Sequence, residues 1–189
     1  MKFKITLKID RKYGDLLPFN YQYEQSAVIY RILAQADTQY SSWLHENGYL
    51  LHERKRFKLF CYSPFIFDKV RPLPETGCLK IIGERAVWYI SFIPEKSTLE
   101  FIQGIFAHQS FTIGNKEYRV AFDVIGVEAI PMPQLSEEMI FQALSPICVK
   151  LHEDNKTHYL SPDNPMFSEG ILKGLKAKYE SIYDKPFDM

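Results

Sequence analysis

The sequence has little of what marks a secreted, membrane-spanning or metal-dependent protein. Its 189 residues contain only three cysteines, at positions 61, 78 and 148. An odd number without a short paired spacing argues against a disulfide framework and against a zinc site. Residues 1–9 alternate between polar and apolar side chains, so they predict neither a signal peptide nor a membrane span. We therefore expect a cytoplasmic protein that carries no metal and no other cofactor.

The chain also has no excess of charge of either sign, because it contains 23 acidic and 23 basic residues. Nucleic-acid binding therefore cannot be inferred from a global positive field and would need a local patch. The sequence has neither a GxxxxGK[ST] phosphate loop nor the glycine fingerprint of dinucleotide-binding proteins. What it does have is an apolar fraction of 46%, which is enough for a hydrophobic core in one large or two small domains.

The first part of the chain shows clear periodic patterns. Residues 2–9 alternate with the period of two that is typical of a half-buried strand. A helix is predicted to begin near Gln22, with its apolar stripe on one face. A second, short helix is predicted to be capped by Asp37 and to end at Asn47-Gly48.

Further elements follow the second helix: a strand at 57–63, a hairpin of 78–82 with 86–93, a helix over 98–108, and strands at 111–113 and 118–129. The hairpin is expected to turn around Gly83-Glu84. The order of strand, helix, two strands, helix and strand predicts an α+β, ferredoxin-like (βαββαβ) domain over residues 1–132.

The remaining residues, 133–189, predict only part of a second domain. Pro131-Met132-Pro133 is the expected boundary, because two prolines beside a change of composition interrupt regular structure. Residues 139–151 are expected to form a strand pair or a bent strand, and Asn164 with Pro165 to begin an amphipathic helix. One strand region and one helix cannot cover each other's apolar faces, so we expect an incomplete second ferredoxin-like unit whose helix packs on the first domain or on another chain.

Three side chains could carry the chemistry of RNA cleavage. His45 lies roughly 140° from the apolar stripe of its predicted helix at about 100° per residue, so it should be accessible. Histidine suits proton transfer because its ordinary pKa, about 6.5, is close to cellular pH. Lys58 is expected to point away from the core face of its strand and could stabilise charge on a phosphate. Tyr30 is expected to leave its hydroxyl free to orient a ribose or phosphate oxygen.

Each of these residues also has an ordinary structural interpretation. A histidine near a helix end is usually solvated, a strand lysine usually faces water, and a tyrosine of this kind usually packs. The same two possibilities apply to Arg54, Lys55 and Arg56, which could bind phosphates beside the site or could form a solvated, charge-protected strand edge. The residues alone do not decide between these interpretations.

Several segments in order resemble the CRISPR repeat-processing endoribonucleases of the repeat-associated (RAMP) RNA-binding superfamily. They are Leu-Pro-Phe-Asn-Tyr-Gln-Tyr at 17–23, Ile-Tyr at 29–30, Leu-His-Glu at 44–46, the segment 57–63 and Leu-Ser-Pro-Ile at 144–147. The resemblance implies that Tyr30, His45 and Lys58 form one site. It further implies metal-independent cleavage of precursor CRISPR RNA within its repeats, which leaves 2′,3′-cyclic phosphate and 5′-hydroxyl ends.

The resemblance also implies a difference from that family. Its members continue with more strands and a glycine-rich loop that contacts RNA, and this sequence has no such loop, so a C-terminally truncated member is expected. Two alternatives to cleavage therefore stay open. The chain could hold repeat RNA without cutting it, or it could associate with itself or with other CRISPR-associated proteins through an uncovered apolar surface.

Overall fold

The computed structural model describes residues 1–51, 55–153 and 156–187. The chain forms two compact units. Unit 1 comprises residues 1–46 and 60–139, and unit 2 comprises residues 47–59 and 140–189. The domain boundary between residues 132 and 133 stays a prediction.

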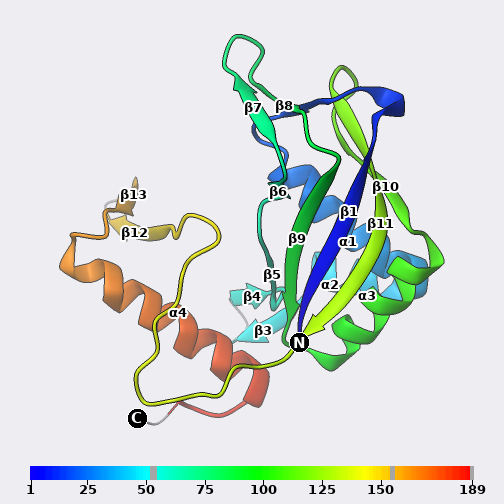
Figure 1. The fold of residues 1–189 in the computed structure, drawn as a ribbon. Coiled ribbons are helices and arrows are strands. Elements are labelled where there is room, and N and C mark those ends of the chain that lie inside the picture. The colour runs from blue at the N-terminus through cyan, green and yellow to red at the C-terminus, as the bar shows by residue number, and fades with distance from the viewer. Residues whose placement is uncertain (52–54, 154–155, 188–189) are drawn as a thin grey trace. The chain divides into compact units, whose positions relative to one another are not determined.

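The first predicted strand is confirmed as β1 (Lys2–Asp10). Its alternation places Phe3, Ile5, Leu7 and Ile9 in the core. β1 pairs antiparallel with β11 (Arg119–Ile130) on one side and with β9 (Arg85–Phe92) on the other. A strand hydrogen-bonded on both sides is internal, and β1 is therefore the centre of the main sheet (Figure 1).

The main sheet of unit 1 has the order β10-β11-β1-β9-β5, and β6 also pairs with β9. The short strands are β5 (Phe60–Tyr62), β6 (Ile66–Phe67) and β10 (Ser110–Gly114). Helix α1 (Gln22–Ala36) connects β1 toward β5, and α3 (Glu95–Ala107) connects β9 toward the β10–β11 pair. This is the predicted ferredoxin-like order, with β10 added at one edge.

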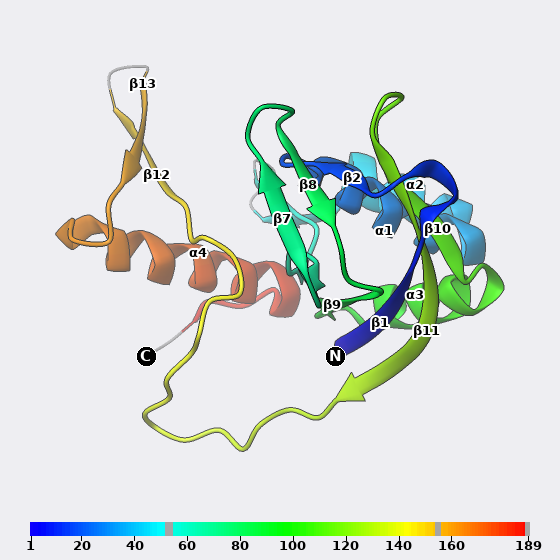
Figure 2. The same ribbon diagram turned by 45° about the horizontal axis from the view of Figure 1, so that its top comes forward.

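The helices α1 and α3 pack against each other and cover the apolar face of the sheet (Figures 1 and 2). Phe101 of α3 contacts Phe92 of β9 and Phe3 of β1, with ring centroids 4.9 and 6.4 Å apart. The two helices approach most closely at Gly104, where a side chain would meet the backbone of Ile32. The predicted second helix is α2 (Thr38–Glu46), and Asp37 caps it by accepting from the Tyr40 amide at 2.8 Å.

The interval between α2 and α3 corrects two predictions. Residues 57–63 are not one strand, because Lys58 and Leu59 separate β4 (Lys55–Phe57) from β5. Leu59 has a φ of 55°, and a left-handed residue interrupts the extended backbone.

The predicted hairpin of 78–82 with 86–93 is also wrong. β8 (Cys78–Ile81) pairs instead with β2 (Leu16–Pro18) and β7 (Val70–Leu73) in a separate three-stranded sheet. At the turn predicted around Gly83-Glu84, the backbone instead binds Arg11 of the short 3-10 helix η1 (Arg11–Tyr13). Its guanidinium donates to the carbonyl oxygens of Ile81, Ile82 and Gly83 at 3.0–3.1 Å. The sequence next to the turn did not indicate these long-range partners.

Unit 2 contains the hairpin of β3 (Tyr49–Leu51) with β4, the hairpin of β12 (Val149–Glu153) with β13 (Lys156–Leu160), and α4 (Pro165–Tyr183). Asn164 caps α4 by accepting from the Met166 amide at 2.9 Å, as predicted. The strand pair predicted at 139–151 is wrong, because residues 131–148 have no regular structure and the hairpin begins at 149.

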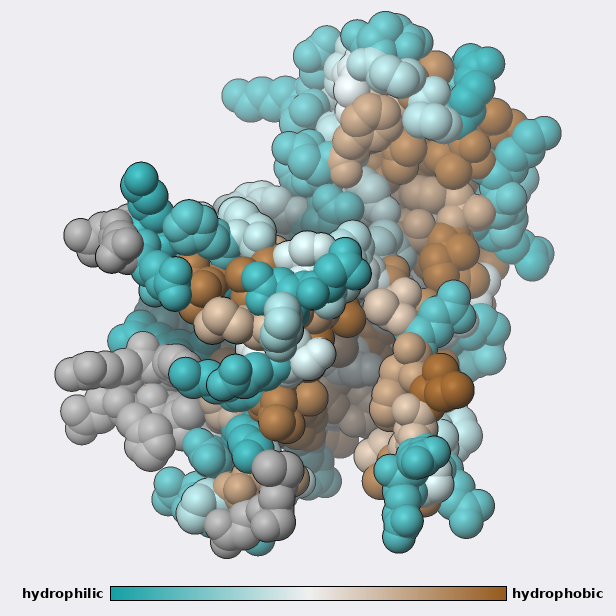
Figure 3. Space-filling view, turned by 90° about the vertical axis from the view of Figure 1, so that its left-hand side faces the viewer, coloured by the Kyte–Doolittle hydropathy of each residue, from teal (hydrophilic) through white to brown (hydrophobic). Residues whose placement is uncertain are grey.

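Within unit 2, α4 lies against β3 and β12, yet many of its neighbouring apolar side chains stay exposed. They include Ile140, Phe141, Ile147, Leu172 and Leu175. On the face shown in Figure 3, hydrophobic side chains are interspersed with hydrophilic ones.

None of the helices in the described part of the chain is both long enough and apolar enough to cross a membrane.

Candidate functional site

Tyr30 of α1 and His45 of α2 form the centre of the candidate site. Their ring centroids lie 4.9 Å apart at an interplanar angle of 82°, which is an edge-to-face contact. The contact follows from the tight corner at Asp37 between the two helices. The Ser41 hydroxyl of α2 donates to the Tyr30 carbonyl at 2.8 Å and ties the helices together at this level. The structure therefore brings together two of the three predicted catalytic residues.

The two side chains differ in exposure. His45 lies in the last turn of α2 and is exposed, whereas Tyr30 is half-buried. Burial raises the pKa of the Tyr30 phenol above its usual 10.0, and the neighbouring Tyr62 raises this pKa further. The phenol therefore stays protonated at neutral pH and can donate a hydrogen bond. A neutral donor beside an exposed imidazole suits a site that handles a phosphodiester.

An aromatic support behind Tyr30 was missed from the sequence. Phe60 of β5 contacts the Tyr30 ring edge-to-face at 5.7 Å, and it stacks on Tyr62 at 6.3 Å. Buried Gln25 of α1 donates to the Ser63 carbonyl at 2.9 Å and holds the helix against the end of β5. The period of two in a strand places residues 60 and 62 on one face. This alternation was visible in the sequence, but a strand predicted over all of residues 57–63 gave no reason to pair residues 60 and 62 with Tyr30.

Lys58 lies in unit 2, in the connection between β4 and β5, and not in a strand as predicted. Its side chain is half-buried. Burial lowers the pKa of Lys58 below the usual 10.5, and the positive charge of Arg56 lowers it further. The participation of Lys58 in a site with Tyr30 and His45 stays a prediction.

Two of the three cations predicted to bind RNA belong to β4. Arg54 falls outside the described residues. Lys55 is at the first position of β4, opposite Leu51, and Arg56 follows it opposite Leu50 with an exposed side chain. Contact of these residues with RNA stays a prediction.

No group of three or more His, Cys, Asp or Glu side chains in the described ranges is arranged to hold a metal ion. On the β12–β13 hairpin, the ring Nδ1 of His152 forms a hydrogen bond of 3.0 Å with the Thr157 hydroxyl.

The fold is similar to that of solved structures of other proteins. Two solved structures share the fold over almost the whole chain. One is described as "Characterization of a Cas6-related gene from Pyrococcus furiosus", with a TM-score of 0.79, 24% identity, and coverage of 100% of this chain and 73% of that one. The other is "An RAMP protein binding different RNA substrates", with a TM-score of 0.76, 24% identity, and coverage of 98% and 73%. These likenesses show the class of the fold, which is α+β with ferredoxin-like architecture.

The sequence comparison identifies the family within that class. Residues 16–122 match the family "CRISPR-associated protein Cas6, N-terminal", and residues 130–189 match "CRISPR associated protein Cas6, C-terminal". The chain belongs to the Cas6 family. Among curated proteins it is 29% identical over 190 residues to "CRISPR-associated endoribonuclease Cas6 1" of Methanocaldococcus jannaschii, covering 98% of this chain and 69% of that protein. The resemblance inferred from the short sequence segments is confirmed.

Proposed function

We propose that this chain is a metal-independent endoribonuclease that cuts precursor CRISPR RNA within its repeats in the cytoplasm. Membership of the Cas6 family supports the substrate class, since the relative from Methanocaldococcus jannaschii is named a CRISPR-associated endoribonuclease. The observation that carries the chemistry is the contact of the exposed His45 ring with the Tyr30 phenol ring at 4.9 Å. An imidazole and a phenol in contact at an accessible surface offer a proton acceptor and a proton donor for one phosphodiester.

The proposed reaction needs two proton transfers. The ribose 2′-oxygen bonds to the adjacent phosphorus while the bond from phosphorus to the 5′-oxygen breaks. His45 accepts the proton from the 2′-hydroxyl and returns it to the departing 5′-oxygen, which takes the electron pair of the broken bond. The products are a 2′,3′-cyclic phosphate and a 5′-hydroxyl, and no atom of water is consumed.

Tyr30 and Lys58 assist the reaction in this scheme. The phenol of Tyr30 is held protonated by its raised pKa, so it can donate to a nonbridging phosphate oxygen and orient the scissile group. The ammonium of Lys58 supplies positive charge to the same phosphate, where charge accumulates as the 2′-oxygen attacks. Arg54, Lys55 and Arg56 extend the cationic surface along the RNA backbone.

The test is cleavage of an end-labelled repeat RNA from the CRISPR array of the same organism, carried out in chelator. The wild-type chain should give a product ending in a cyclic phosphate. His45→Ala should slow cleavage by about 10²-fold to 10⁴-fold, the usual contribution of a positioned acid or base, while the RNA is still retarded in a gel. His158→Ala is the matched control, because His158 is also exposed but lies on β13, and it should cut at the wild-type rate.

Two results would contradict the proposal. Product that forms only after a divalent metal is added would exclude the mechanism as written. Retardation of the RNA without product, unchanged in His45→Ala, would instead identify a protein that binds repeat RNA without cutting it.

Self-association and contact with other CRISPR-associated proteins also stay predictions, and sedimentation at several concentrations distinguishes a monomer from an assembly.

A further inference from the structure

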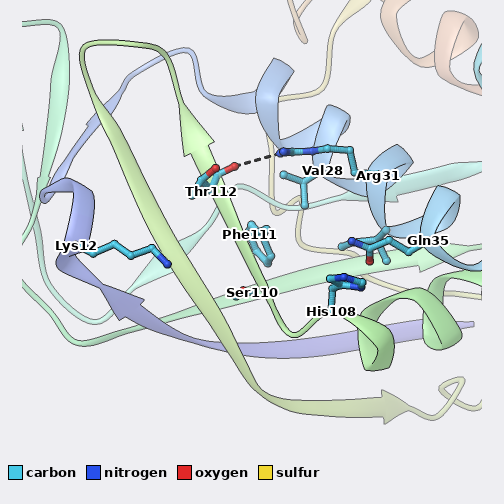
Figure 4. Close-up of a pocket in the computed structure, with 9 residues that line it drawn as sticks. Lys12, Val28, Arg31, Gln35, His108, Ser110, Phe111 and Thr112 are labelled. Atoms are coloured by element: carbon cyan, nitrogen blue, oxygen red, sulfur yellow. Dashed lines mark hydrogen bonds between the residues drawn. The ribbon is translucent and has the colours of Figure 1, made fainter.

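A pocket lies in unit 1, between α1 and the edge strand β10 (Figure 4). Its volume is about 280 Å³, close to the lower limit of about 300 Å³ for small-molecule sites. The lining residues come from η1, α1, the connection after α3 and the start of β10. They are Lys12, Val28, Arg31, Ile32, Gln35, His108, Ser110, Phe111 and Thr112. We refer to it as the α1–β10 pocket.

The floor of the α1–β10 pocket is apolar. Val28 and Ile32 are fully buried residues of α1. Phe111 of β10 is half-buried, and its ring is fixed from below by stacking on Phe122 at 5.5 Å and by contact with Trp88 at 6.0 Å. A rigid aromatic and aliphatic floor suits a flat, weakly polar group such as a nucleobase.

The rim of the pocket is polar and cationic. Figure 4 shows Lys12 from η1 and Arg31 from α1 reaching toward it from different sides, with Gln35 and His108 close together at one end. No carboxylate is among the nine lining residues. The rim therefore offers only donors and neutral groups to a ligand, which favours an anion.

The two strong cations of the rim are available to a ligand. Arg31 donates one bond, to the Thr112 carbonyl at 3.2 Å, and a guanidinium has five N–H groups. Among the described residues, no carboxylate forms an ion pair with Arg31. Lys12 is paired with Asp10 at 3.3 Å, but the side chains are 50% and 30% exposed. Exposed pairs of this kind contribute little, so a phosphate can compete for the lysine.

We propose that the α1–β10 pocket binds a ribonucleoside 5′-phosphate, either free or as one nucleotide of an RNA strand. The phosphate contacts Arg31, and the base covers the half-buried ring of Phe111. A bare anion would bind the rim but would leave the accessible part of the Phe111 ring in water. An acidic peptide would carry its charge on flexible side chains and would not need a flat floor.

This site is separate from the Tyr30–His45 pair. Tyr30 and Arg31 are successive residues of α1, so their side chains leave the helix about 100° apart. Tyr30 faces α2 and Phe60, whereas Arg31 faces β10. Nucleotide binding in the pocket therefore does not depend on the proposed cleavage chemistry, and an RNA strand crossing α1 could occupy the pocket and the pair together.

The test is a titration of the ¹⁵N-labelled chain followed by NMR, with 5′-AMP, inorganic phosphate and a short 2′-O-methyl oligoadenylate, which has no 2′-hydroxyl to attack. Saturable shifts from AMP should centre on the amides of Arg31 and residues 110–112, and AMP should bind more tightly than phosphate. Arg31→Ala should weaken AMP binding by about 10-fold to 100-fold, the value of one or more charge-assisted hydrogen bonds. Arg71→Ala is the matched control, an exposed arginine on β7 outside the lining, and it should leave the affinity unchanged.

The variant Phe111→Leu separates nucleotide binding from simple anion binding. It keeps an apolar core residue but removes the flat ring, so it should weaken AMP and leave inorganic phosphate unaffected. Weakening of the oligoadenylate by Arg31→Ala would assign the pocket to an RNA strand, and weakening of AMP alone would assign it to a free nucleotide. The proposal is wrong if neither AMP nor oligoadenylate shifts residues 110–112, if Arg31→Ala and Arg71→Ala weaken AMP equally, or if phosphate binds as tightly as AMP and Phe111→Leu has no effect. The dispersion of each variant's spectrum shows whether it is folded.

Discussion

Replacing Gly104 by alanine should force helices α1 and α3 apart. A Cβ at this position would overlap the main-chain carbonyl oxygen of Ile32 and would lie 2.8 Å from its carbonyl carbon. The obstacle is backbone in the interior of a helix, which cannot rotate aside as the end of a long side chain can. One of the two helices must therefore shift for the methyl group to fit.

The size of the effect can be worked out from two opposing contributions. Overpacking a well-filled interface typically costs about 1–3 kcal/mol, and contact with backbone argues for the upper end. Alanine is about 0.5–1 kcal/mol better than glycine inside a helix. We expect a net loss of about 2 kcal/mol, which lowers Tm by roughly 4–8 °C for a chain of this length. Because Ile32 is two residues beyond Tyr30 in α1, cleavage should slow as well.

The assay can be confined to unit 1. The chain has two tryptophans, Trp43 and Trp88, and both belong to unit 1, so tryptophan fluorescence monitors its unfolding selectively. The matched control is Gly174→Ala in α4 of unit 2, where a Cβ would meet nothing within 4 Å. That substitution should leave the fluorescence midpoint unchanged and should raise the midpoint of the helical circular dichroism signal. An unfolding midpoint for Gly104→Ala equal to or above that of the wild type would refute the assigned helix packing.

Three further changes test the site and the two helix caps. Tyr30→Phe keeps the ring contact and removes only the hydroxyl, so single-turnover cleavage should slow while the unfolding midpoint stays nearly constant; an unchanged rate would exclude the phenol from the reaction. Hydrogen bonding from the Tyr40 amide, followed by the charge of Lys96, lowers the pKa of Asp37 below 3.8, so its ionised form stabilises the fold above that pH and this contribution is lost as the pH falls through the lower, folded-state pKa. Urea midpoints of Asp37→Asn should therefore fall less steeply on acidification than those of the wild type, and equal slopes would contradict the pairing. Asn164→Ala removes the cap on the Met166 amide and should cost about 1 kcal/mol of α4 stability by circular dichroism, whereas Asn164→Asp should retain most of it.

The parts of the fold that the sequence predicted correctly are those set by local pattern. The alternation of residues 2–9 was sufficient for β1, and the helical stripe with a capping Asp37 was sufficient for α1 and α2. The grouping of Tyr30 with His45 came from the family resemblance and not from local pattern, although the two residues lie on adjacent helices joined by a tight corner. Local pattern also fixed the start of α4 at Asn164 and Pro165.

The failures include partners that are distant in sequence and a backbone conformation that local pattern does not predict. β8 pairs with β2, and Arg11, about seventy residues earlier in the chain, binds the carbonyl groups at the predicted turn. No pattern next to residues 78–93 could indicate these two partners. The strand break at Leu59 depends on a left-handed backbone conformation that an apolar residue rarely adopts. The α1–β10 pocket was invisible for a similar reason, since Arg31 and Thr112 are separated by 81 positions.

The central place of β1 has a consequence for synthesis of the protein. In the described part of the chain, β1 pairs with residues 85–91 and 121–130, which are synthesised long after it. The backbone amides and apolar side chains of β1 therefore lack their native strand partners in the nascent chain until most of unit 1 has been translated. The intervening helices α1 and α2 can form from local contacts during that time, so the Tyr30–His45 corner can be assembled before the sheet that supports it has closed.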